Sequence, residues 1–316
     1  MSGIKPARVA IVGCGAIGGF YGVMLARAGL DVHFLLRSEY DAVAARGLHI
    51  SSRVHGELQL ENAQAYASAQ DMPACDWVLV GAKTTANAEL ATAINQVAAR
   101  EAKVVLLQNG LGVEDALRPA LRPDVHLLAG LCYICAHREA PGVVVHQALG
   151  AVNLAYHSGP LAESGLLLAQ QGAEMFQQAG LESKAMDNLE QTRWQKLVWN
   201  VPFNGLSALL DANTRELMGQ AASRALVADI MQEVVDAGAA LGQRMPEDYA
   251  QKLLAATDRM PDYLPSMYHD FKLGREAELE AIYARPLAVA AEAGMAMPKV
   301  QALYQSLQFL QARRGH

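Results

Sequence analysis

A glycine-rich hexapeptide near the amino terminus constrains the fold of this 316-residue chain more than any other feature. The run Gly13-Cys14-Gly15-Ala16-Ile17-Gly18 follows the apolar segment Arg8–Val12 and opens an apolar helix that ends near Gly29. In such a G-x-G-x-x-G pattern the first glycine permits a tight turn, the second lets a pyrophosphate approach the backbone, and the third lets helix and strand pack closely. A second strand at Asp31–Leu36 completes a βαβ unit. The sequence therefore predicts that the hexapeptide binds a dinucleotide; the alternative is a glycine-rich turn without a ligand.

Short apolar runs alternate with helical stretches before about residue 187. We predict strands at Arg8–Val12, Asp31–Leu36, Trp77–Val80, Lys103–Leu107 and His126–Ile134. Several of them are apolar on both faces, which is typical of a parallel, doubly wound sheet. The segments Gly47–Leu60 and Pro141–Ala155 alternate more and are expected to add strands at the edge or end of that sheet.

Helical periodicity replaces the strand pattern after residue 187. The apolar residues between Leu226 and Val235 recur at helical spacing in a helix that ends at Gly242, and further helices are expected at about 247–259, 276–293 and 299–313. The predicted fold is thus α/β, with an N-terminal Rossmann-type doubly wound sheet over residues 1–187 and an all-α C-terminal domain over residues 188–316.

Composition excludes several classes of partner. The chain has 26 Lys and Arg against 32 Asp and Glu, a net charge of −6, which gives no basic footprint for nucleic acid or for an anionic membrane surface. No apolar run reaches the length of a membrane span, and the amino terminus lacks the pattern of a signal peptide. The chain has four cysteines, too few for a disulfide scaffold. We therefore expect a cytoplasmic protein with no nucleic-acid or membrane partner.

The end of the second strand indicates which dinucleotide binds. A residue about 20 positions beyond the glycine pattern meets the adenosine ribose, and here the sequence reads Leu36-Arg37-Ser38, without a carboxylate. The Arg37 guanidinium can pair with a 2′-phosphate, and Ser38 can donate a further hydrogen bond. These residues predict NADP in preference to NAD; the alternative is a solvated arginine at the end of a strand.

Two further polar positions follow predicted strands. Lys83 comes after the strand Trp77–Val80, and Asn109-Gly110 follows the strand Lys103–Leu107. Open α/β sheets bind ligands at the carboxyl ends of their strands, so both positions are candidates for ligand contacts. Each is equally consistent with a cap or turn residue.

The helical half contains one segment with polar residues at regular spacing. The segment runs from Trp194 to Asn204. Within it, Lys196, Asn200 and Asn204 occur at i, i+4 and i+8 among apolar neighbours. At about 100° per residue, these three side chains share one helix face. Lys196 is either an ammonium held in a cleft or a side chain that extends its charge to the surface.

Taken in order, these motifs resemble the ketopantoate reductase (2-dehydropantoate 2-reductase) family across essentially the whole chain. The matching elements are Gly13–Gly18, Arg37, Lys83, Asn109-Gly110-Leu111-Gly112, Trp194-Gln195-Lys196-Leu197 with Asn200 and Asn204, and Ser266-Met267 followed by Glu278. The resemblance implies reduction of 2-dehydropantoate to pantoate by NADPH, a step toward pantothenate. It also implies that residues 1–187 bind NADP and that the helical domain supplies the substrate and catalytic residues.

The resemblance assigns roles to single residues. Lys196 is implied to be the proton donor, and Asn109, Lys196, Asn200, Asn204 and Ser266 are implied to contact the substrate. The hexapeptide, Arg37, Lys83, Asn109, Ala136 and Glu278 are implied to contact the cofactor. Glu278 is also implied to be catalytic, holding either the ammonium or the nicotinamide ribose in place. These roles suit the chemistry, because hydride arriving at a carbonyl carbon creates alkoxide charge that a positioned cation stabilises and protonates.

Some positions depart from the family or constrain its geometry. Pro202 lies between the two helix asparagines and is expected to kink their helix, and Thr214 stands where some relatives have an asparagine, although Asn213 adjoins it. A straight helix from Ser266 to Glu278 would place them about 18 Å apart. We therefore predict an interruption near Leu273-Gly274-Arg275.

The sequence leaves three functions open. The chain is either a ketopantoate reductase, a member of the same family that reduces another branched 2-oxo acid, or a non-catalytic NADP-binding regulator. No metal is predicted, because Cys132 and Cys135 are three residues apart and would point to opposite faces of a strand. The expected partner is a small 2-oxo acid, and the sequence is compatible with a homodimer without indicating one.

Overall fold

The computed structural model describes residues 7–84 and 87–313, which divide into two compact units. The sheet unit comprises the chain up to Gln108 and Val113–Leu189. The helical unit comprises Asn109–Gly112 and the chain from Glu190 onward. The short excursion at Asn109–Gly112 is the point at which this division differs from a single cut along the sequence.

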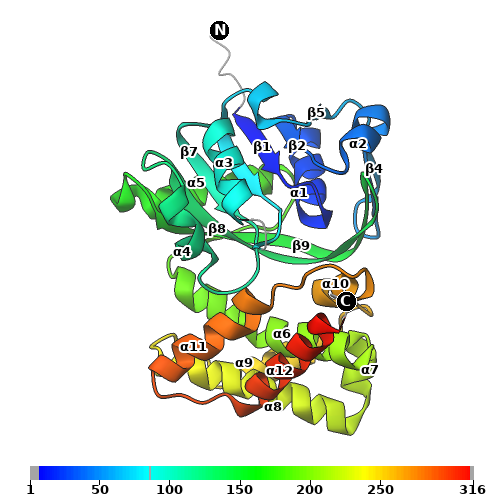
Figure 1. The fold of residues 1–316 in the computed structure, drawn as a ribbon, viewed down its shortest axis with the longest axis vertical. Helices are drawn as coiled ribbons and strands as arrows, with labels where there is room; N and C mark the ends of the chain where they lie inside the picture. The colour runs from blue at the N-terminus through cyan, green and yellow to red at the C-terminus, as the bar shows by residue number, and fades with distance from the viewer. Residues whose placement is uncertain (1–6, 85–86, 314–316) are drawn as a thin grey trace. The chain divides into compact units, whose positions relative to one another are not determined.

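The sheet unit is built on one ten-stranded, mostly parallel sheet (Figure 1). Its strands are β1 (Arg8–Val12), β2 (Asp31–Leu35), β3 (Leu48–Ser52), β4 (Gly56–Leu60), β5 (Gln64–Tyr66), β6 (Cys75–Val80), β7 (Ala98–Leu106), β8 (His126–Ala140), β9 (Val143–Ser158) and β10 (Ala185–Met186). The order is β4-β3-β9-β8-β7-β6-β1-β2-β5, with β10 paired to β9. Only β3–β4 and β8–β9 pair antiparallel among the described strands. This arrangement confirms the predicted Rossmann-type α/β class.

The seven predicted strand segments all contain strands. Gly47–Leu60 divides into β3 and β4, and Pro141–Ala155 corresponds to β9. These strands form one end of the sheet, but β4 alone is the edge strand there. β9 lies inside the order because its whole length pairs with β8 in a long hairpin, while its first residues pair with β3.

Helix α1 (Ala16–Arg27) lies at the centre of the sheet unit's core. It packs against β1 and β2 and also against β3, β4, β8 and β9, so the sheet curls around it (Figure 1). Phe20 and Tyr21 of α1 are completely buried, as is Phe34 on β2. The remaining helices of this unit are α2 (Tyr40–Arg46), α3 (Asn87–Val97), α4 (Val113–Leu117) and α5 (Gly165–Gln178).

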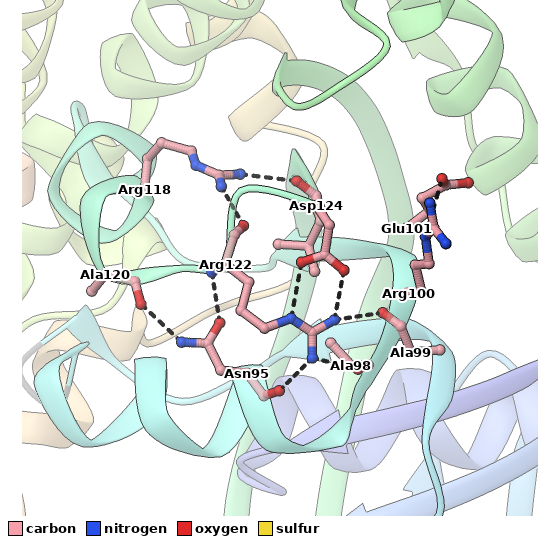
Figure 2. Close-up of polar contacts among 10 residues, drawn as sticks. Asn95, Ala98, Ala99, Arg100, Glu101, Arg118, Ala120, Arg122 and Asp124 are labelled. Carbon is pink, nitrogen blue, oxygen red and sulfur yellow. Dashed lines mark hydrogen bonds and ion pairs between the residues drawn. The ribbon is translucent and has the colours of Figure 1, made fainter.

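A polar cluster fixes the amino ends of β7 and β8 (Figure 2). The Arg122 guanidinium donates to both carboxylate oxygens of Asp124, each at 3.0 Å. It also donates to the carbonyls of Asn95, Ala98 and Ala99 at 2.8 to 3.1 Å, at the end of α3 and the start of β7. All five guanidinium N–H groups are therefore engaged, and carbonyls that the helix end leaves without helical partners are satisfied.

The helical unit contains the all-α part of the fold. Its elements are α6 (Leu189–Leu210), α7 (Thr214–Gly219), α8 (Ala221–Ala240), α9 (Tyr249–Thr257), α10 (Ser266–Lys272), the π-helical segment η5 (Glu280–Ala284), α11 (Arg285–Glu292) and α12 (Pro298–Ala312). Trp194, Phe203 and Tyr283 are fully buried in its core. None of the helices within residues 7–84 and 87–313 is long and apolar enough to cross a bilayer.

The predicted interruption after Ser266 is confirmed. Helix α10 ends at Lys272, and Gly274 has a φ of 61°, a left-handed conformation that glycine adopts without strain. Helix α6 continues through Pro202 to Leu210. Beside the proline, the Tyr283 hydroxyl donates to the Val201 carbonyl at 2.8 Å. The kink at Pro202 stays a prediction.

Candidate functional site

The glycines of the hexapeptide have three different environments. Gly13 has a φ of +89°, and a Cβ there would lie 2.5 Å from the Ala82 nitrogen. A Cβ on Gly18 would lie 2.2 Å from the Gly13 carbonyl oxygen, so the fold itself requires the first and third glycines. A Cβ on Gly15 would meet nothing within 4 Å. The space that a pyrophosphate needs in this pattern is therefore open at the second glycine, and α1 begins directly after it.

A pocket opens beside this loop within the sheet unit. Its lining residues are Val12, Gly13, Cys14, Gly15, Leu35, Leu36, Arg37, Ser38, Glu39, Ala82, Glu89, Leu90, Ala93 and Arg138. The structure thus brings together four of the predicted cofactor residues, Gly13, Cys14, Gly15 and Arg37, with Ser38 beside them. The glycine cradle and the arginine at the end of β2 fit a phosphate-bearing dinucleotide.

The other predicted cofactor residues of this unit lie outside the lining. Ala16 and Ile17 are half-buried in the first turn of α1, and Gly18 is buried against β1. Lys83 is half-buried directly after the lining residue Ala82. Ala136 is buried on β8, two residues before Arg138, and alternate residues of a strand share a face.

Three charged lining residues were missed by the sequence analysis. Glu89, in the first turn of α3, accepts a 2.6 Å hydrogen bond from Nη1 of Arg37. Glu39 is only 6% exposed and forms an ion pair with Arg138. Glu39 and Arg138 each lie two residues beyond a predicted site residue, Arg37 and Ala136. This spacing could have marked both as candidates for the same site. Glu89 comes from another element, and nothing in its local sequence marks it.

Cys14 lines this pocket as a neutral side chain. Burial, together with the nearby Glu39 carboxylate, raises the pKa of the Cys14 thiol well above its ordinary value. A thiol that stays protonated is a poor nucleophile and behaves as a small apolar group. Its part in the site is therefore to shape the loop.

In the helical unit, the side chain of Lys196 is hydrogen-bonded to the side chain of Asn109. Lys196 is 8% exposed, which disagrees with a lysine that extends its charge to bulk solvent. Its Nζ donates to Oδ1 of Asn109 at 2.7 Å. The amide oxygen of Asn109 accepts this bond and holds Nζ at a fixed position.

The two asparagines on the same face of α6 are buried. Asn200 is 7% exposed and Asn204 is 3% exposed. Oδ1 of Asn204 accepts a long hydrogen bond of 3.5 Å from the backbone nitrogen of Met267. This contact connects the polar face of α6 to the first turn of α10, where Ser266 is the first residue and is half-buried.

Glu278 lies on a segment that also holds the Asn109 loop. It is 7% exposed and comes two residues before η5. The Leu111 nitrogen donates to the carbonyl of Ala281 in η5 at 2.8 Å. Gly110 has a φ of +102° and passes so close to η5 that a Cβ on it would lie 2.4 Å from the Cβ of Ala281.

All six predicted catalytic and substrate residues belong to the helical unit, including Asn109, which the sequence places among the strands. Single π-helical turns are frequent at functional sites.

The two residues at the family's variable position have structural partners. The Asn213 side chain caps α7 by accepting from the Glu216 nitrogen at 2.9 Å. The Thr214 hydroxyl accepts from the Tyr263 nitrogen at 3.1 Å. The four cysteines are free and buried, and no group of three or more His, Cys, Asp or Glu within the described ranges could hold a metal ion.

Comparison with known proteins gives matches along nearly the whole chain. The family model "Ketopantoate reductase PanE/ApbA" matches residues 9–159, and the model "Ketopantoate reductase PanE/ApbA C terminal" matches residues 188–311. A 2-dehydropantoate 2-reductase of Nostoc sp. is 39% identical over 97% of this chain and 96% of its own length.

Two solved structures extend this comparison. The 2-dehydropantoate 2-reductase of Geobacter metallireducens GS-15 has a TM-score of 0.88 at 38% identity, covering 95% of this chain and 99% of that one. The 2-dehydropantoate 2-reductase of Methylococcus capsulatus has a TM-score of 0.84 at 32% identity, covering 98% of each chain. The similarity therefore includes both units described above.

Proposed function

The chain belongs to the ketopantoate reductase family and is an oxidoreductase of that family, and from this premise we propose that it reduces 2-dehydropantoate to pantoate with NADPH in pantothenate biosynthesis. The observation that carries the proposal is the partly buried hydrogen bond between Lys196 and Asn109. It provides a positioned cation with a proton to give, which is what reduction of a carbonyl group requires from the protein.

Lys196 acts as the general acid in this proposal. Bound NADPH would supply a hydride to the carbonyl carbon of the 2-oxo acid. As negative charge develops on the carbonyl oxygen, the Lys196 ammonium stabilises it and transfers a proton to that oxygen, which becomes the hydroxyl group of pantoate. Asn109 accepts one N–H of Lys196 and so directs the remaining two toward other acceptors.

The remaining polar residues of the helical unit bind the substrate. Asn200 and Asn204 continue the face of Lys196 along α6. Ser266 immediately precedes Met267, whose backbone nitrogen donates to Asn204. Amide and hydroxyl groups can hold a carboxylate and a hydroxyl without changing their own charge. We assign Glu278 to the nicotinamide ribose or to the Lys196 ammonium, in either case as a fixed acceptor.

The cofactor residues proposed in the sheet unit are Gly13, Cys14, Gly15, Ala16, Ile17, Gly18, Arg37, Lys83 and Ala136. The open space at Gly15 and the amino end of α1 would hold the pyrophosphate, and Arg37 would hold the 2′-phosphate that distinguishes NADP from NAD. Asn109 and Glu278 complete the set of residues proposed to contact the cofactor.

The test is a steady-state assay of NADPH oxidation with a panel of 2-oxo acids, using the wild type and Lys196→Ala. We expect 2-dehydropantoate to have the highest kcat/KM, and Lys196→Ala to reduce kcat by about 10²–10⁴-fold. A higher kcat/KM for another branched 2-oxo acid would reassign the substrate within the family. Full turnover by Lys196→Ala would remove the acid role, and an absence of turnover with every acid would favour a binding protein.

Three further proposals concern the domains, the cellular location and the assembly of the protein. Residues 1–187 form the NADP-binding domain and residues 188–316 the substrate and catalytic domain, apart from Asn109–Gly112, which cluster with the helical unit. The enzyme acts in the cytoplasm on a small 2-oxo acid. A homodimer is the assembly to test, by light scattering coupled to gel filtration.

A further inference from the structure

The pocket of the sheet unit contains two arginines and two glutamates that pair with one another. Arg37 faces Glu89, with Nη1 and Oε2 2.6 Å apart, and Arg138 faces Glu39. The four charges cancel within the lining. We propose, on the basis of the dinucleotide site proposed above, that Glu89 sets the preference between nucleotides with and without a 2′-phosphate. It does so by competing with the phosphate for Arg37.

Exposure decides which of the two pairs a phosphate can open. The Arg37 and Glu89 side chains are each 76% exposed, so water solvates both charges when they separate and the pair contributes little. Glu39 is 6% exposed, so removing Arg138 from it would leave a buried carboxylate without its cation. Arg37 is therefore the arginine that is available to an incoming phosphate.

The charge of the ligand decides the direction of the effect. A phosphate monoester carries close to two negative charges at neutral pH. The Glu89 carboxylate still belongs to the lining of the same pocket after it leaves Arg37, because α3 holds it there. The carboxylate therefore weakens phosphate binding in two ways: it competes for Arg37, and it repels the bound phosphate. A free 2′-hydroxyl instead can donate a hydrogen bond to a carboxylate. Glu89 thus opposes the phosphorylated nucleotide and tolerates the other.

Calorimetric titration of the full chain with 2′,5′-ADP and with 5′-AMP tests the proposal without any turnover. We expect Glu89→Gln to lower the Kd for 2′,5′-ADP by about fivefold, the upper range for an exposed ion pair, and to leave the Kd for 5′-AMP unchanged or higher. Glu89→Lys should increase the preference for 2′,5′-ADP over 5′-AMP, measured as the ratio of the two Kd values, further than Glu89→Gln does. In an Arg37→Ala background the effect of Glu89→Gln should shrink. Asp258→Asn is the matched control, because it opens the exposed 2.7 Å pair with Arg224 in the helical unit and should alter neither Kd.

The outcomes separate this inference from the proposed function. An unchanged or reduced preference for 2′,5′-ADP in both Glu89 variants would overturn the inference, because Glu89 would then orient Arg37 rather than compete for it. If the wild type still binds both nucleotides, the proposed function is unaffected by that result. If the wild type binds neither nucleotide, the dinucleotide site and the role of Glu89 are both wrong.

Discussion

Nζ of Lys196 donates a 2.7 Å hydrogen bond to Oδ1 of Asn109, although 87 positions separate the two residues in the sequence. The bond depends on the close passage of Gly110 and Leu111 along η5, which holds the Asn109 loop within the helical unit. A residue that follows a sheet strand therefore positions the ammonium of α6. The pair gives the first prediction.

Asn109→Asp places a carboxylate beside the Lys196 ammonium. The added negative charge stabilises the protonated amine and weakens it as a proton donor. We expect kcat to fall by about tenfold or more, and the alkaline limb of the kcat/KM profile to move to higher pH. The measurement is the pH profile of NADPH oxidation. Asn213→Asp is the control, since Asp is an equally good cap for α7; a profile that moves equally in both variants would contradict the pairing.

The glycines of the hexapeptide give the second prediction, because the fold needs only two of them. Gly18→Ala forces a Cβ against the Gly13 carbonyl and should destabilise the protein by about 1–3 kcal/mol or more. Gly15→Ala adds a methyl group to open space, so Tm should stay unchanged while the Kd for NADPH rises by about tenfold. Thermal unfolding and a NADPH fluorescence titration measure the two effects. A loss of Tm in Gly15→Ala without a change in Kd would argue against a pyrophosphate at this position.

The strand core and the glycine loop were predictable because their signals are local. Strands buried on both faces, such as β1 and β6, read as continuous apolar runs, and the turn at Gly13 requires a residue without a side chain. The break after Lys272 was also predictable, since one straight helix would have separated Ser266 from Glu278. Each of these inferences uses only spacing along the chain.

Long-range relationships were not predictable from one sequence. The pairing of Glu89 with Arg37 joins the first turn of α3 to the end of β2, and no periodicity connects these positions. The place of Asn109 in the helical unit follows from the contact between Leu111 and Ala281, which lie 170 positions apart in the numbering. Roles for Lys196, Asn200 and Ser266 came from the family resemblance, since polar spacing on a helix fits a solvated face equally well.

Ser266 gives the third prediction, for substrate binding. Ser266→Ala removes a hydroxyl group at the start of α10 without enlarging a side chain. We expect the KM for the 2-oxo acid to rise by about tenfold, the effect of one lost hydrogen bond, while the KM for NADPH stays constant. Ser306→Ala is the matched control, because the Ser306 hydroxyl donates to the Ala302 carbonyl within the same helix, α12. Equal effects of the two substitutions on the 2-oxo acid would remove Ser266 from the substrate site.

The fourth prediction concerns the stability of the sheet unit in mild acid. Burial lowers the pKa values of His33, His126 and His146 below the ordinary 6.5. At His146, burial outweighs the bond to Ala148, which by itself would raise the pKa. The Nε2 of His146 lies 3.0 Å from the Ala148 carbonyl, which can only accept, so the ring donates there and its Nδ1 accepts from Ser52. A neutral ring satisfies both bonds, whereas protonation opposes the second.

The sign follows from linkage. Because the folded pKa values lie below the unfolded value, the unfolded chain binds more protons between the two, and stability falls as the pH drops below about 6.5. We expect Tm to be constant above about pH 7 and to decrease steadily toward pH 5. His146→Gln should reduce the slope of that decrease. A Tm that stays flat from pH 7 to 5 would contradict the assignment of neutral buried rings.

The Arg122 cluster gives the last prediction, a change in stability without a change in chemistry. Arg122 uses five N–H groups to hold Asp124, the end of α3 and the start of β7, at the amino ends of β7 and β8 (Figure 2). Arg122→Lys keeps the charge but offers only three donors from one atom, so backbone carbonyls lose their partners. We expect a loss of about 1–3 kcal/mol in unfolding free energy, seen as a lower Tm. Because Arg122 and Asp124 are not among the residues that line the pocket, kcat/KM at 25 °C should not change. Arg100→Lys, which alters a side chain that is 86% exposed, should leave both Tm and kcat/KM as they are, and an equal loss of Tm in both variants would show that the five-donor network contributes nothing.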